Sequence, residues 1–119
     1  MRLLLALCLA ASPVAAENWM RRDGDRSFDK ITLDARLRGA VIEFYDGGLG
    51  EYYTDGRYTY TYANSGGTGY GYFEVQEDGS VCVEFVNGFS RCDLFVLDQQ
   101  DRLVVITEQG DRFPVRPEG

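Results

Sequence analysis

Residues 80–97 read SVCVEFVNGFSRCDLFVL. Two runs rich in valine, phenylalanine and leucine flank Asn87-Gly88, and this dipeptide between strand-like runs is the strongest short-range signal of a β-hairpin. Each run carries one cysteine. The stretch therefore predicts two antiparallel strands whose register decides whether the cysteines can meet.

Two registers fit this hairpin. A two-residue loop places Glu84 opposite Arg91 and leaves the cysteines on opposite faces. A three-residue loop, Val86–Gly88, places Cys82 directly opposite Cys92 and puts a glycine where such loops need a left-handed residue. An exposed cross-strand charge pair contributes under ~1 kcal/mol, whereas a short disulfide loop contributes about 3 kcal/mol. We therefore predict the register that allows a Cys82–Cys92 disulfide.

Turn-forming residues recur outward from the hairpin at intervals of about ten residues, which is typical of antiparallel all-β folds. These turns are Asp46-Gly47-Gly48, Asp55-Gly56, Asn64-Ser65-Gly66-Gly67, Asp78-Gly79, Gln100-Asp101 and Gln109-Gly110. The stretches between them are rich in valine, isoleucine, tyrosine, phenylalanine and threonine, which favour strands. This spacing predicts an antiparallel meander, a sandwich or a small barrel.

Tyrosines mark the middle of the chain. Residues 57–62 read RYTYTY, so three tyrosines share one face of a strand. Further on, Tyr70 and Tyr72 share a face, whereas Phe73 and Val75 fall on the opposite one. We interpret this change of phase, beside Gly69 and Gly71, as a bulge or a bend.

One short helix is predicted near the N-terminus. Thr32 is the expected cap, Asp34 suits the first turn, Arg36 and Arg38 suit the last turn, and Gly39 ends the helix. Its packing residues would be Ile31, Leu33 and Leu37.

The first residues read as an export signal. Residues 1–16, MRLLLALCLAASPVAA, combine a positive start, a short apolar run and small residues before the expected cleavage after Ala16. The apolar run is shorter than the ~20 residues that a membrane span needs, and Cys8 lies too close to the start for a lipoprotein signal. We expect three regions: a signal peptide over 1–16, a loose lead-in over 17–30 and a single β domain over 31–117. The location would be the periplasm or the exterior, where Cys82 and Cys92 can be oxidised.

Charge and composition exclude several functions. The formal net charge of −7 and the pI near 4.5 argue against nucleic acid as a partner. The chain has no histidine, which removes histidine-based catalysis and the common zinc sites. Asp23–Asp34 matches a calcium loop only in part, because Phe28 stands where that loop needs glycine. We expect no cofactor, no metal and no enzymatic activity, although a carboxylate pair for glycoside hydrolysis stays an alternative.

Aromatic residues supply the candidate binding surface. Tyrosine combines apolar area with a polar tip and suits both a sheet core and a binding surface. The alternative is that these tyrosines are simply core. The residues that we predict to form the surface, with a glycine-rich loop beside the tyrosine strand, are Tyr58, Tyr60, Tyr62, Ser65, Gly66 and Tyr70.

A family resemblance adds to this interpretation. The pattern combines Gly56-x-Tyr58 and Gly69-x-Gly71-x-Phe73 with Asp78-Gly79-Ser80-Val81-Cys82 and a second cysteine at Cys92. Over about residues 33–116 it resembles small secreted alphaproteobacterial proteins of unknown function. The resemblance implies a lipocalin-like, partly closed antiparallel barrel with one disulfide. We therefore predict a small antiparallel meander that closes into a lipocalin-like barrel of about eight strands.

A looser likeness concerns the loop at residues 65–70. SGGTGY is similar to the S-G-x-x-x-Y loop of periplasmic inhibitors of c-type lysozyme, although their later tryptophan-containing stretch is missing here. An acidic inhibitor would be steered to a basic enzyme. We predict a non-enzymatic periplasmic or secreted binding module for a protein or small-molecule ligand, with no membrane span. The alternative is a proteinaceous inhibitor of a secreted hydrolase such as lysozyme.

Overall fold

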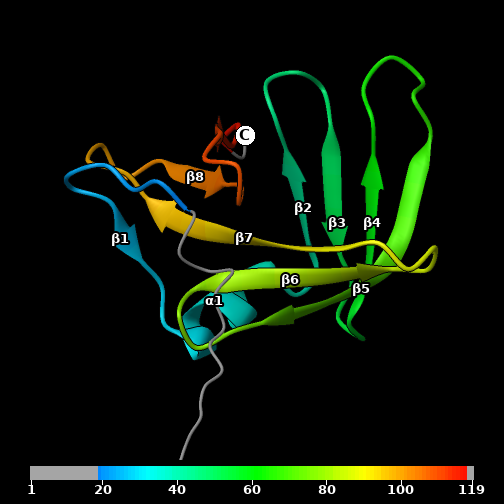
Figure 1. Ribbon diagram of the computed structural model, residues 1–119, viewed down its shortest axis with the longest axis horizontal. Helices are drawn as coiled ribbons and strands as arrows, with labels where there is room; N and C mark the ends of the chain where they lie inside the picture. The colour runs from blue at the N-terminus through cyan, green and yellow to red at the C-terminus, as the bar shows by residue number, and fades with distance from the viewer. Residues whose placement is uncertain (1–18, 118–119) are drawn as a thin grey trace, which may run out of the picture.

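The computed structural model describes residues 19–117, so the predicted signal peptide over 1–16 lies outside the described residues. Within 19–117 the chain forms one helix and a sequence of antiparallel strands (Figure 1). The elements are β1 (Arg26–Ser27), α1 (Lys30–Leu37), β2 (Ala40–Glu43), β3 (Leu49–Tyr52), β4 (Arg57–Thr61), β5 (Thr68–Val75), β6 (Ser80–Phe85), β7 (Ser90–Leu97), β8 (Leu103–Ile106) and β9 (Arg112–Pro114).

Strands β2 to β9 pair in chain order as a meander, and β1 adds to β7. The sheet curls so strongly that β5, β6 and β7 cross in front of β2, β3 and β4 (Figure 1). The predicted closure is wrong, because among residues 19–117 β2 and β9 do not pair with each other and the two ends of the sheet share only an isolated bridge between Phe44 and Val115. Both edge strands are short, and Pro114 in β9 has no N–H to donate. The result is an open half-barrel.

The predicted hairpin register is confirmed. Cys82 lies opposite Cys92, and a disulfide joins them. The N–H of Phe85 donates to the carbonyl of Phe89 at 2.8 Å, which closes the three-residue loop. Gly88 has a φ of +92°, the left-handed conformation that this loop requires.

Strand β5 has no bulge, which corrects the predicted change of phase. Its pairing with β4 and β6 is continuous, with exposed and buried residues alternating along most of the strand. The buried face begins with Gly69 and Gly71, which lie opposite Tyr60 and Tyr58. A Cβ at Gly71 would collide with the backbone of Glu84. At Gly71 the neighbouring strand therefore leaves no room for a side chain, whereas Gly69 lies close to the ring of Phe85.

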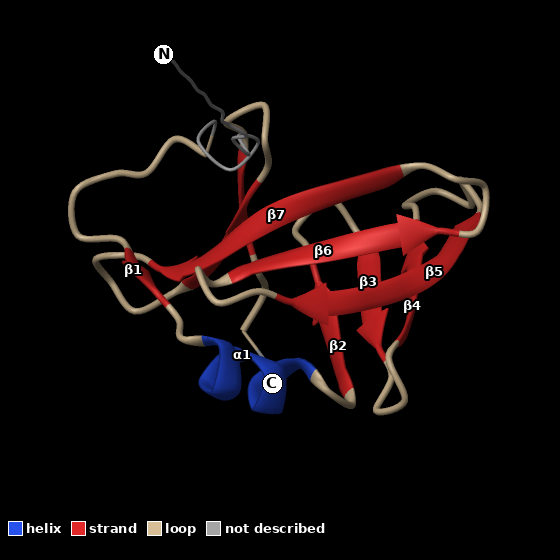
Figure 2. Cartoon of the chain, turned by 60° about the horizontal axis from the view of Figure 1, so that its bottom comes forward, coloured by secondary structure: helices blue, strands red, loops and turns tan. Residues whose placement is uncertain are grey.

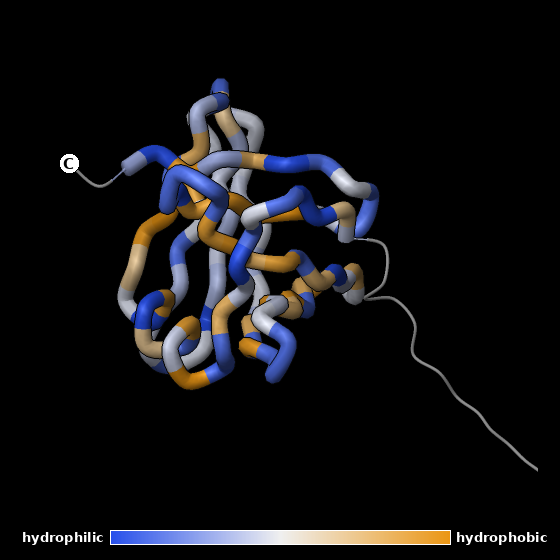
Figure 3. Tube along the Cα trace, turned by 90° about the vertical axis from the view of Figure 1, so that its left-hand side faces the viewer, coloured by the Kyte–Doolittle hydropathy of each residue, from blue (hydrophilic) through white to orange (hydrophobic). Residues whose placement is uncertain are grey.

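Helix α1 packs against β2 and β5 at one end of the half-barrel (Figure 2). Leu33 and Leu37 are fully buried in the inner core, as predicted, but Ile31 is 83% exposed and takes no part. The cap is Asp29 and not Thr32, because the Asp29 carboxylate accepts a hydrogen bond from the N–H of Thr32 at 2.8 Å. The inner core also contains Phe73, Phe95 and the valines of β5 and β6, and the hydrophobic segments run through the middle of the molecule (Figure 3).

Parts of residues 19–29 are held on the sheet, although a loose lead-in over 17–30 was expected: Arg26 and Ser27 pair with β7, and Phe28 packs against the inner core. Trp19 packs on a second apolar cluster, and its Nε1 donates to the carbonyl of Cys92 at 3.1 Å. This cluster consists of Leu94, Val96, Val104 and Ile106.

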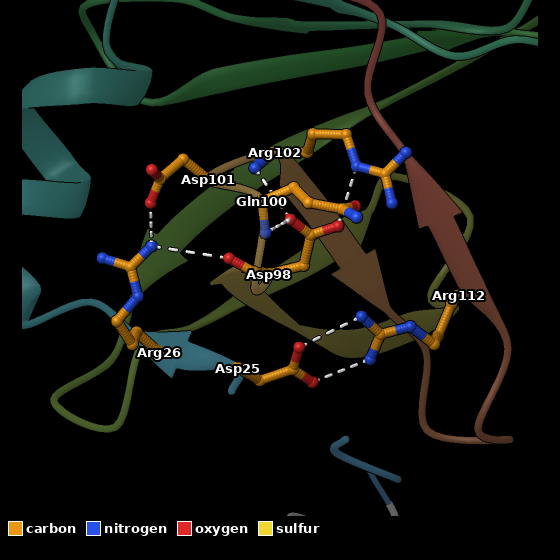
Figure 4. Close-up of polar contacts among 7 residues, drawn as sticks. All are labelled: Asp25, Arg26, Asp98, Gln100, Asp101, Arg102 and Arg112. Atoms are coloured by element: carbon orange, nitrogen blue, oxygen red, sulfur yellow. Dashed lines mark hydrogen bonds and ion pairs between the residues drawn. The ribbon is translucent and has the colours of Figure 1, made fainter. Parts of the chain in front are cut away.

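Ion pairs fix the same segment to the β7–β8 and β8–β9 region (Figure 4). Arg112 donates two hydrogen bonds to Asp25, at 2.8 and 3.1 Å, with both side chains largely buried. Arg26 pairs with Asp101. Asp98 accepts from Arg102 at 2.9 Å within the β7–β8 turn. Asp25 thus forms an ion pair with an arginine. Within residues 19–117, no three side chains that could ligate a metal lie together.

Candidate functional site

A meander places alternate loops at opposite ends of its sheet. The β2–β3, β4–β5, β6–β7 and β8–β9 loops therefore lie at the end away from α1. A cavity of about 220 Å³ occupies the inner face near these loops. Its lining combines aromatic residues with one ion pair and includes Phe44, Tyr60, Tyr62, Phe113, Arg91 and Asp93.

Four aromatic rings form one wall of the cavity. The ring centroids of Tyr62 and Tyr60 are 4.9 Å apart, and Phe44 lies 6.3 Å from both Tyr60 and Phe113. Exposure rises along β4 and the residue that follows it, from 2% at Tyr58 to 50% at Tyr62. The three tyrosines that were predicted to share a face thus extend from the core to the opening of the cavity.

Gly48 sets the position of Tyr60. A Cβ at Gly48 would collide with the Tyr60 hydroxyl, so the ring reaches its place only because residue 48 has no side chain. The neighbouring Asp46 accepts a hydrogen bond from the N–H of Gly48 at 2.8 Å. Partial burial, and next the charge of Asp46, raise the pKa of Tyr60.

An ion pair also lines the cavity. The Nε of Arg91 donates to the Oδ2 of Asp93 at 3.0 Å, and the guanidinium lies 5.8 Å from the ring centre of Phe85. The Arg91 side chain is 33% exposed and that of Asp93 is 11% exposed. The other oxygen, Oδ1 of Asp93, is buried and has no hydrogen-bond partner among residues 19–117.

Burial dominates the protonation of this region. It raises the pKa of Asp93 despite the opposing charge of Arg91. It also raises the pKa of Tyr58 to about 12, and that of Tyr52 well above its usual value. Both hydroxyls are therefore neutral near pH 7. The site offers neutral polar tips, one guanidinium and one incompletely satisfied carboxyl group.

A second groove, of about 300 Å³, adjoins the cavity. Tyr62 and Arg91 line both spaces, and Phe85 and Phe89 line the groove. Phe89 is 62% exposed. The two spaces together form an aromatic mouth at the loop end of the half-barrel.

The residues of the surface predicted from sequence do not all lie on the same side of the sheet. Tyr58, Tyr60 and Tyr62 line the cavity, with Tyr58 at its floor. Gly66 lines the adjoining groove, and Ser65 is exposed in the same loop. Tyr70 pairs with Thr59 and lies on the outer face, 57% exposed. The sheet thus separates Tyr70 from the rest.

Sequence reasoning missed the ion pair and the two phenylalanines of the cavity wall. Arg91 and Asp93 flank Cys92, so the chosen disulfide register already turned both charges to the face opposite the disulfide. That face carries Val83 and Phe95, which are core residues. Two charged residues on a face of core residues could therefore have indicated the ion pair.

A larger cleft of about 490 Å³ lies at the seam between β2 and the β8–β9 end of the sheet. Its lining includes Arg36, Arg102 and Arg116. Arg102 pairs with Asp98, and the guanidiniums of Arg36 and Arg116 lie over the rings of Phe28 and Tyr45. We favour the smaller cavity because its charged pair is better buried and its wall is aromatic.

Between Trp19 and Pro117, no helix has the length and apolar character that crossing a membrane requires.

The chain was compared with known proteins in three ways. A scan against protein-family models, a search of curated proteins and a search of solved structures each gave no match.

Proposed function

We propose that this chain is a non-enzymatic binding module that holds a small ligand in the aromatic cavity. One observation carries the proposal: Tyr60, Tyr62 and the Arg91–Asp93 pair line the same cavity of about 220 Å³. A buried ion pair rarely adds net stability compared with well-packed apolar residues. Its placement at a cavity, with Oδ1 of Asp93 unsatisfied, is better explained by ligand binding.

The proposed location is the periplasm or the exterior. The signal-like N-terminus and the Cys82–Cys92 disulfide support it. The curled antiparallel sheet, with α1 at one end and the aromatic mouth at the other, supports the proposal of a lipocalin-like half-barrel.

Native mass spectrometry of the chain purified from its own extracytoplasmic fraction tests the proposal. We expect a cleaved, oxidised chain that carries extra mass. The Tyr60→Ala/Tyr62→Ala variant should lose that mass. Tyr70→Ala/Tyr72→Ala is the matched control, because these two tyrosines are on the outer face and 57% and 59% exposed. Equal loss in both variants, or no extra mass in the wild type, would contradict the proposal.

The second candidate function is inhibition of a secreted hydrolase such as lysozyme. The β4–β5 loop favours it, because Asn64 and Ser65 adopt φ angles of 60° and 61° in an exposed turn beside the half-exposed Tyr62. The net charge of −7 would steer the chain to a basic enzyme. A dose-response curve against a basic lysozyme tests this function, and a flat curve removes it.

A further inference from the structure

Arg91 is the residue that points to a ligand class. Its Nε is engaged by Asp93 at 3.0 Å, and its planar group is held over the ring of Phe85 at 5.8 Å. These two contacts fix the orientation of the guanidinium. Within residues 19–117, no acceptor bonds to Nη1 or Nη2 of Arg91. The outer edge of the guanidinium therefore has two donors to offer.

This residue also lies where the two concave spaces meet. Arg91 and Tyr62 line both the cavity and the adjoining groove. The side chain is 33% exposed, so it is accessible but partly shielded from water. Partial shielding strengthens a charge-assisted hydrogen bond compared with one at a fully exposed arginine.

The chemistry of a guanidinium edge selects a two-oxygen acceptor. Parallel N–H donors match the two oxygens of a carboxylate, which gives a bidentate pair. The same cavity is lined by the rings of Tyr60, Phe44 and Phe113, which suit a flat apolar body. The size of the cavity limits that body. An apolar cavity of about 150 Å³ can hold benzene, so about 220 Å³ suits one ring with one small head group.

We propose that the cavity binds a small carboxylate with a single flat ring, the carboxylate on the guanidinium edge of Arg91 and the ring on the Tyr60–Phe44 wall. This inference rests on the proposed function, since it names the ligand class of the same cavity. The competing class is an organic cation, which the net charge of −7 and Asp46 at the cavity would favour.

Three probes with the same ring decide between these classes. Benzoate, benzamide and benzylammonium are each titrated into the oxidised chain by calorimetry at pH 7. We expect benzoate to bind about 10- to 100-fold more tightly than benzamide, because its two anionic oxygens form a bidentate ion pair with the guanidinium, whereas the neutral amide has a single acceptor oxygen. Benzylammonium should bind more weakly than both.

The variant Arg91→Lys keeps the charge but removes the guanidinium edge. It should reduce the preference for benzoate over benzamide at least tenfold. The matched control is Arg57→Lys. Arg57 also pairs through Nε with an aspartate two residues away, Asp55, and lies over an aromatic ring, that of Tyr53, but it is on the outer surface. This control should bind all three probes like the wild type.

The outcomes separate this inference from the proposed function. Equal binding of benzoate and benzamide would overturn the carboxylate assignment. Tightest binding of benzylammonium, lost in Asp46→Asn, would assign the cavity to a cation instead. If no probe binds while the purified chain carries extra mass that depends on Tyr60 and Tyr62, the carboxylate inference falls and the binding function stays. If no probe binds and no such mass is found, both fall. If Arg91→Lys fails to fold, the wild-type comparison of the three probes decides alone.

Discussion

The double variant Arg91→Met/Asp93→Leu separates a structural ion pair from a functional one. Removing a single partner of a buried pair typically costs 3–5 kcal/mol, whereas replacing both partners by apolar residues is often neutral or stabilising by 1–4 kcal/mol. The Asp93 side chain is 11% exposed and that of Arg91 is 33% exposed, so water screens this pair in part. We therefore expect Asp93→Ala to lower the free energy of unfolding by about 2 kcal/mol. The double variant should change it by under about 1 kcal/mol in either direction.

Urea unfolding monitored by circular dichroism gives these values, provided that the slope with denaturant is unchanged. The outer pair of Asp55 and Arg57 serves as control. Exposed pairs contribute about 0–1 kcal/mol, so its removal should hardly change the free energy of unfolding. Ligand capture is measured on the same samples and should be lost in the double variant. A double variant that loses as much stability as Asp93→Ala, or that still captures ligand, would refute the idea that the pair is retained for binding.

Three further predictions concern the surroundings of the site. Gly48→Ala should displace the ring of Tyr60 and weaken ligand capture about tenfold or more, measured by calorimetry, with under about 3 kcal/mol lost in urea unfolding; unchanged capture would show that Tyr60 is not part of the site. The hydrogen bonds from Arg112 lower the pKa of Asp25 below its usual 3.8, so this pair stabilises the fold above that value and the contribution is lost as pH falls through the lower, folded value. Asp25→Asn should therefore cost about 1–3 kcal/mol at pH 6 and progressively less in acid, followed by urea unfolding at several pH values; a cost independent of pH would contradict this. Trp19→Ala should expose the outer apolar cluster and lower stability by about 2–4 kcal/mol, with increased binding of a hydrophobic dye; no change in either would mean that the lead-in does not protect the sheet.

Parts of the fold follow directly from local patterns. The register of the central hairpin was predictable because the disulfide outweighs the competing charge pair of Glu84 and Arg91 by about 2 kcal/mol. The alternation of residues 57–62 likewise gave the tyrosines a common face. Both patterns depend on near neighbours in the chain or across one turn.

Other features depend on packing that a local pattern does not contain. Gly69 and Gly71 carry no apolar side chain, so their burial beneath Tyr60 and Tyr58 was not visible in the alternation of β5. Closure of the barrel depends on whether β2 and β9 can pair along their length, and within residues 19–117 the two ends of the sheet share only an isolated bridge.

The candidate site was predictable only in part. The tyrosines of β4 were found because aromatic residues stand out in a sequence. The ion pair was missed because Arg91 and Asp93 look like ordinary solvent-facing residues in the sequence. Only when the disulfide register is used to assign the two faces of the strand do both charges fall on the core face. Tyr70 was included because it lies near the loop in sequence, although the sheet separates the two faces.

The most direct test of the binding cavity is a map of backbone and side-chain amide shifts in a nuclear magnetic resonance titration with benzoate. We predict that the largest shifts fall on Tyr60, Tyr62 and the Nε–H of Arg91, and that the outer-face Tyr70 stays unchanged. Shifts confined to the outer face, or to the arginines of the seam cleft, would contradict the assignment of this cavity as the binding site.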